Sequence, residues 1–154
     1  MRNDLDFLTD TILHISEVRE NLEIMTGELT RRGLTHDRTK LQAFEFDAFV
    51  STRDKFKKAN YGSKEYQECV DATKPAIDHH YKHNSHHTGF HADGINGMTL
   101  IDIMEMVADW RAAARRSPDK TLFDTLDYCF KKYKIEKQLR AIIMNTLVRL
   151  KWIE

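Results

Sequence analysis

The sequence predicts an all-α protein, a single-domain bundle of about six helices. Apolar residues recur every three or four positions along most of the 154 residues, which is the spacing of helices that bury one face. No stretch alternates apolar and polar residues as a half-buried strand would. Internal repeats, low-complexity tracts and interdomain linkers are also missing from the sequence. We therefore expect residues 1–154 to form one helical domain.

The composition excludes several functional classes. Lys plus Arg and Asp plus Glu balance at 24 each, so no overall field favours stable binding to nucleic acid or to anionic lipid. The charged N-terminus and the absence of an 18-residue apolar run argue against secretion and membrane insertion. Cys69 and Cys129 lack a C-x-x-C arrangement, which is typical of buried free thiols in reducing compartments. We expect a cytoplasmic protein.

The first expected helix runs from Asp4 to Arg32 and ends at Gly33. Its apolar residues follow the helical period and predict one buried stripe. His14 lies at the edge of this stripe and can face the interior. An isolated histidine in such a place is also compatible with a satisfied core imidazole.

A second helix is expected from Thr35, as N-cap, to about Lys55. It would place His36, Asp37 and Lys40 in its opening turns. After a connection over residues 57–63, which includes Asn60 and Gly62, another helical segment leads to Thr73. Pro75 is then expected to begin or kink a helix that carries His80.

The chain from Ser85 to Met98 is the longest irregular segment, and long loops in compact domains tend to be functional. Thr99 and Asp102 have the spacing of a capping box, which predicts a helix to Arg116 that ends at Pro118. Two amphipathic helices are expected over residues 120–133 and 136–151.

Six of the eight histidines lie between Ile77 and Gly94. Borderline divalent metals prefer imidazole and carboxylate ligands, so this concentration indicates a metal site. The alternative explanation for the concentration of histidines is a polar loop exposed to solvent. Helical spacing makes the members unequal. We expect metal ligation by His80, His86 and His87, and we assign His91 to substrate or solvent.

Acidic residues follow on the next expected helix. Asp102, Glu105 and Asp109 share one face, and for the first two a solvated face is the simpler interpretation. Asp109 lies in the apolar run MVADWRAAA, which predicts burial and hence a need for a partner such as a metal. His36 and Asp37 can converge on one ion because a helix end allows local distortion.

The order His14, then His36 with Asp37, then Asp109 resembles the H...HD...D signature of the HD-domain superfamily of helical metal-dependent phosphohydrolases. HDRTK and VADWRAA are similar to other segments of that superfamily. HHTGFHADG is similar to the HHExxDGxGYP segment of the branch that opens cyclic dinucleotides, although the glutamate and the GYP ending are absent. The overall arrangement looks most like a small family of uncharacterised phage and bacterial proteins with HD-like features.

The resemblance implies hydrolysis of a nucleotide or related phosphoester. One ion would be held by His14, His36, Asp37 and Asp109, and a second, sharing Asp37, by His80, His86 and His87. A water acidified by one or two divalent ions (Mn, Fe, Zn or Ni) would attack phosphorus. Lys40 would neutralise phosphoryl charge, and Glu105, with Asn21 and Asn84, would orient ligands or handle protons.

Two other functional classes stay open from the sequence. Some HD branches use the same helical ligand set as mixed-valent di-iron oxygenases. A non-catalytic metal- or nucleotide-binding protein, such as a phage antagonist of host signalling, is the third possibility. The oligomeric state is open as well, because the C-terminal apolar stripes fit either an interface or a core.

Overall fold

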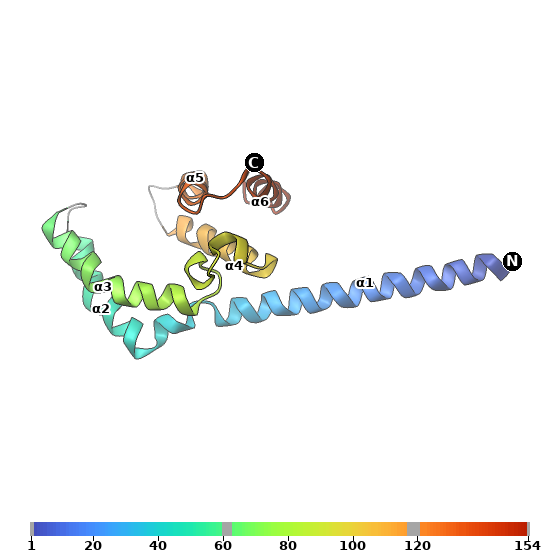
Figure 1. Cartoon of the computed structure of the whole chain (residues 1–154), viewed down its shortest axis with the longest axis horizontal. Coiled ribbons are helices and arrows are strands. Elements are labelled where there is room, and N and C mark those ends of the chain that lie inside the picture. Colours follow the sequence, from blue (N-terminus) through green and yellow to red (C-terminus); the bar gives the residue numbers. More distant parts are fainter. Residues whose placement is uncertain (1, 60–62, 117–120, 154) are drawn as a thin grey trace. The chain divides into compact units, whose positions relative to one another are not determined.

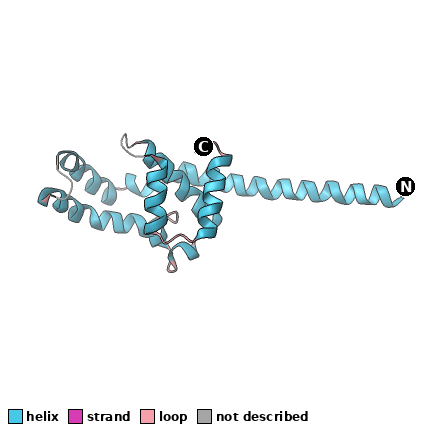
Figure 2. Cartoon of the chain, turned by 90° about the horizontal axis from the view of Figure 1, so that it is seen from above, coloured by secondary structure: helices cyan, strands magenta, loops and turns pink. Residues whose placement is uncertain are grey.

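The computed structural model describes residues 2–59, 63–116 and 121–153. Within these ranges the protein is all-helical, with six α-helices, three short 3-10 helices and no strand (Figure 2). The expected fold class, an all-α helical bundle, is confirmed. The expectations placed on Asn60, Gly62 and Pro118 fall outside the described residues. The chain divides into two compact units, Met1–His36 and Asp37–Glu154, and each is described by itself.

The N-terminal unit is helix α1, Arg2–Thr35 (Figure 1). Its 34 residues correspond to a length of about 50 Å. The helix passes through Gly33, so the expected end at that glycine is wrong. Thr35 is not the N-cap of a following helix either, because its hydroxyl donates back to the carbonyl of Arg31 at 3.0 Å.

The second unit begins with a tight turn instead of the expected continuous helix. Asp37 has left-handed backbone angles, φ 55° and ψ 19°, which interrupt a right-handed helix. The 3-10 helix η1, Arg38–Leu41, follows, and Gln42 is extended. Helix α2 therefore starts only at Ala43 and runs to Lys58.

Helix α3, Lys64–His83, packs along α2. The hydroxyl of Ser63 caps its start by accepting from the Tyr66 amide at 3.2 Å. Pro75 lies inside this helix and does not begin a new one. The two helical segments expected on either side of Pro75 are thus a single element, which carries His80 in its last turn.

The irregular segment that follows holds two short 3-10 helices, η2 (Thr88–Phe90) and η3 (Gly94–Gly97). The capping box is confirmed: the Asp102 amide donates to Thr99 Oγ1 at 3.2 Å, and the Thr99 amide donates to Asp102 Oδ2 at 2.9 Å. Helix α4 then spans Leu100–Arg115.

Helices α5 (Leu122–Lys132) and α6 (Lys137–Arg149) complete the chain. They bury a common core with α4, and its fully enclosed members include Met106, Leu126, Ile135 and Leu147. Cys69 and Cys129 are buried free thiols, as expected. Among the helices of the described residues, none combines the length and the apolar character that a membrane crossing requires.

Candidate metal centre

Four side chains converge inside the second unit. One potential ligand atom from each lies within 4.8 Å of all the others, and all four atoms are buried. Asp37 comes from the turn before η1, His80 from the end of α3, and His86 and His87 from the segment after α3. Three imidazoles and one carboxylate match the ligands that zinc, iron, manganese and nickel accept.

The end of α3 explains how three histidines meet. Helix geometry stops at Asn84, which is extended, and the His87 amide then donates to the Asn84 carbonyl at 3.0 Å. This turn brings the next two histidines back beside the last helical turn. The ring centroids of His80 and His87 are 4.8 Å apart, and those of His86 and His87 are 4.0 Å apart.

His80 is held between two carboxylates. Its Nε2 lies 3.1 Å from Asp37 Oδ1, and its Nδ1 lies 3.0 Å from Glu45 Oε2. Glu45 is fully buried, with 0% of its surface exposed. A carboxylate at Nδ1 favours the tautomer with the proton on that nitrogen, which leaves the Nε2 lone pair directed at the centre.

His86 repeats this arrangement. Its Nε2 lies 3.5 Å from Asp37 Oδ1, and its Nδ1 lies 3.2 Å from Glu105 Oε1. Two histidines from different segments thus share one pattern, with a carboxylate behind the ring and the other nitrogen facing inward. This is the usual outer support of metal-bound imidazole.

His87 completes the set from one side. Its Nε2 is buried and has no hydrogen-bond partner among the described residues. Burial, followed by the neighbouring rings of His86 and His80, lowers the pKa of His87 to about 3. The ring is therefore neutral at physiological pH and keeps a lone pair. Buried polar atoms normally have a partner, and a metal ion would supply one here.

Asp37 uses its two oxygens differently. Oδ1 faces His80 and His86, whereas Oδ2 accepts a hydrogen bond from Lys40 Nζ at 2.6 Å. An oxygen of Asp109 lies within 4.8 Å of an oxygen of Asp37. The left-handed backbone of Asp37 is sparsely populated outside glycine, and such conformations cluster at functional sites.

Thr39 and Asn84 form hydrogen bonds with the groups around the His80 ring. The Thr39 hydroxyl donates to Glu45 Oε2 at 2.9 Å, and Asn84 Nδ2 donates to Thr39 Oγ1 and to the His80 carbonyl, each at 2.8 Å. Glu45 also contacts His79, whose Nδ1 is 2.7 Å from Oε1. Neither Glu45 nor Thr39 was expected from the sequence. A carboxylate inside the apolar run AFEFDAF was the signal for Glu45.

Most of the other residues expected at the site lie in or near the centre. Glu105, expected to take part in catalysis or to orient ligands, lies behind the ring of His86, and Lys40 is bound to Asp37. Asp109 is half-buried. Asp102 is buried instead of solvated, because Ser85 Oγ donates to its Oδ1 at 2.7 Å. The His91 ring donates from Nε2 to the Ser85 carbonyl at 2.8 Å, which gives it a structural contact.

His14 does not join His36. Both belong to the N-terminal unit, where α1 is continuous from Arg2 to Thr35. At 1.5 Å per residue, His14 lies about 30 Å from the end of that helix, next to which His36 stands. His14 is also exposed. The expectation that these two histidines ligate the same ion in one chain is corrected by the length of the helix.

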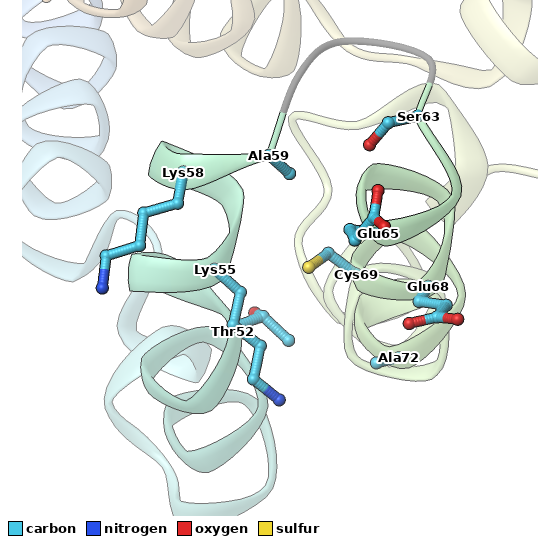
Figure 3. Close-up of a pocket in the computed structure, with 9 residues that line it drawn as sticks. All are labelled: Thr52, Lys55, Lys58, Ala59, Ser63, Glu65, Glu68, Cys69 and Ala72. Carbon is cyan, nitrogen blue, oxygen red and sulfur yellow. The ribbon is translucent and has the colours of Figure 1, made fainter.

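A separate cavity of about 570 Å³ lies between the last turns of α2 and the first turns of α3 (Figure 3). The residues of the metal centre do not line it, because Glu45 and His80 lie at the opposite ends of these two helices. Its lining mixes both charges with small residues: Thr52, Lys55, Lys58, Ala59, Ser63, Glu65, Glu68, Cys69 and Ala72.

The fold and the site define an all-helical protein with a buried cluster of three imidazoles and a carboxylate. Residues 3–149 match the model of a family described as a family of unknown function (DUF5662). The chain therefore belongs to this family. No curated protein matches it. No solved structure matches it either.

Proposed function

We propose that the protein is a metal-dependent phosphohydrolase that acts on a nucleotide or a related phosphoester. The observation that carries this proposal is the convergence of ligand atoms from Asp37, His80, His86 and His87 within 4.8 Å. The resemblance of HDRTK and VADWRAA to HD-domain segments supports the reaction class. The imidazole-rich ligand set favours Mn, Fe, Zn or Ni over Mg.

A divalent ion at this centre would supply Lewis acidity, which brings the pKa of water close to neutrality and polarises a phosphoryl oxygen. Residues around the candidate ligands orient the rings and keep His87 neutral. Glu45 and Glu105 contact Nδ1 of His80 and His86, which would orient both rings with Nε2 toward the ion. Burial keeps His87 neutral, which removes proton competition for its Nε2.

Lys40 provides a positive charge beside the centre. Its ammonium is 2.6 Å from Asp37 Oδ2, and 41% of its side chain is exposed. A phosphoryl oxygen that approaches Asp37 from the solvent side would therefore meet this charge. Asp109, close to Asp37, offers a further carboxylate for a second ion. His36, the chain neighbour of Asp37, stays a ligand predicted from the sequence.

A structural metal site is the second candidate, and one observation favours it. Four protein ligands with buried atoms are the number found in closed structural zinc sites, whereas catalytic zinc sites usually have three and keep one position open. In this case the metal would tie together the turn before η1, the end of α3 and the segment that follows α3. Turnover of a phosphoester substrate would distinguish a catalytic metal site from a structural one.

The test is a hydrolysis assay on tag-free protein loaded with manganese, iron or zinc. Nucleoside phosphates, cyclic nucleotides and a chromogenic phosphodiester are the substrates. We expect turnover that is lost in Asp37→Ala and in His80→Ala and kept in His83→Ala, whose exposed ring contacts the His79 carbonyl. Metal-loaded protein without turnover on any substrate would support the structural role. Full turnover in Asp37→Ala would overturn the proposed mechanism.

A further inference from the structure

Helix α1 carries an apolar stripe with a seven-residue repeat. Leu8, Ile15, Leu22 and Leu29 follow one another at intervals of seven, and Leu5 and Ile12 precede the first two by three positions. Such 3.5-residue spacing is the pattern of a coiled-coil seam. Within the described residues 2–36, which hold only α1 and His36, no other element covers the stripe.

The exposure of this stripe is large. Leu8, Ile15 and Leu22 expose 53%, 61% and 55% of their surfaces. A long row of exposed aliphatic side chains marks an interaction surface. The longest described helix of the second unit, α3, has 20 residues and a length of about 30 Å, against 34 residues and about 50 Å for α1. A second α1 matches the stripe in both length and repeat.

The charges along α1 select the direction of the pair. Arg19 occupies a seam position seven residues after Ile12, so a parallel pair would place two arginines against each other. In an antiparallel pair each Arg19 lies opposite the partner's Ile15, so the two arginines no longer share one layer of the seam. The antiparallel pair also brings Asp4, at the N-terminal end, beside the partner's Arg32, at the C-terminal end, because both residues flank the seam on the same side. Val18, on that flank, then lies at the centre of the pair.

We propose that α1 forms an antiparallel two-stranded coiled coil with α1 of a second copy of this chain. In this register Leu5 packs near the partner's Leu29, and Ile12 packs near the partner's Leu22. The two helix dipoles also run in opposite directions, which is the favourable arrangement. The pairing involves only the N-terminal unit and does not depend on the metal centre.

The first test measures the mass of the full-length protein in solution by sedimentation or light scattering. We expect a dimer at micromolar concentration. Ile12→Asp places a charge in the seam and should weaken the dimer at least tenfold. Ile24→Asp is the matched control, because Ile24 is 71% exposed and lies off the seam. A monomeric wild-type protein, or equal dissociation by the two variants, would overturn the proposal.

The second test addresses direction and needs no buried substitution. Asp4→Arg and Arg32→Asp each place like charges together at both ends of an antiparallel pair, and each should weaken the dimer. The double variant Asp4→Arg with Arg32→Asp restores opposite charges and should recover wild-type affinity. Circular dichroism verifies that α1 stays helical. Absence of recovery in the double variant would contradict the antiparallel pair.

Discussion

Glu45 and His80 are bound through one hydrogen bond that crosses from the start of α2 to the end of α3, with Glu45 Oε2 at 3.0 Å from His80 Nδ1. Both side chains are buried. The opposite nitrogen of the same ring faces Asp37 at 3.1 Å. A carboxylate enclosed at this depth requires a partner, and one partner of Glu45 is the candidate metal ligand His80, whose ring it orients.

Replacing Glu45 should therefore weaken metal binding without removing a ligand. Glu45→Gln keeps the size of the side chain but sets an amide against His79 and His80. We expect the dissociation constant for zinc or manganese to rise about 10- to 100-fold. Competition with a chromogenic chelator measures it, and Glu68→Gln on the exposed face of α3 is the control. Unchanged affinity in Glu45→Gln would show that the carboxylate does not support the centre.

The stability of the metal-free protein should depend on pH through His87. The unfolded chain takes up a proton at this ring below about pH 6.5, whereas the folded protein resists protonation down to about pH 3. Between these values the unfolded state binds more protons than the folded state. The contribution of His87 to the free energy of unfolding is therefore fully present above about pH 6.5 and decreases as the pH falls.

Urea unfolding of the metal-free protein at pH 7 and pH 5 measures this effect. The substitution His87→Asn removes the titrating ring, so the loss of stability between the two pH values should be smaller than in wild type. The matched variant His83→Asn should keep the wild-type pH dependence, because His83 is exposed. An equal loss in wild type and His87→Asn would contradict the prediction.

Metal should stabilise the fold through the same four residues. A ligand that binds only the folded state, at a hundred times its dissociation constant, adds about 2.7 kcal/mol to the free energy of unfolding. Thermal unfolding with and without zinc or manganese tests this. The shift in Tm should disappear in Asp37→Ala and remain in His83→Ala. A full shift in Asp37→Ala would place the bound metal elsewhere.

Lys40 should affect turnover more than metal affinity. Its ammonium binds Oδ2 of Asp37, while Oδ1 faces the imidazoles. Lys40→Met removes the charge that would meet a phosphoryl oxygen, and we expect kcat to fall about 100-fold. Lys64→Met, on an exposed lysine at the start of α3, is the control. Wild-type kcat in Lys40→Met would exclude the lysine from catalysis.

The sequence predicts most of the helices because their determinants are local. The capping box of Thr99 and Asp102 locates the start of α4 within one turn, and apolar periodicity locates the other helices. The turn at Asp37 was missed because a left-handed aspartate carries no strong local signal. The pairing of Glu45 with His80 was missed for a different reason, since it depends on how α2 packs against α3.

The four converging residues were all among the expected ligands, because the chemistry of imidazole and carboxylate is visible in the sequence. His14 was different. The apolar periodicity of its helix predicted a buried face, but periodicity does not show what covers that face. The unbroken length of α1, which separates His14 from His36, became visible only in the structure.

The most direct test of the metal centre is elemental analysis of protein purified without an affinity tag. We predict about one equivalent of a divalent transition metal per chain in wild type and in His83→Ala. Far less metal should remain when Asp37 and His87 are both replaced by alanine. A wild-type protein that holds no metal after incubation with manganese, iron, zinc or nickel, or a double variant that retains the full equivalent, would contradict the account.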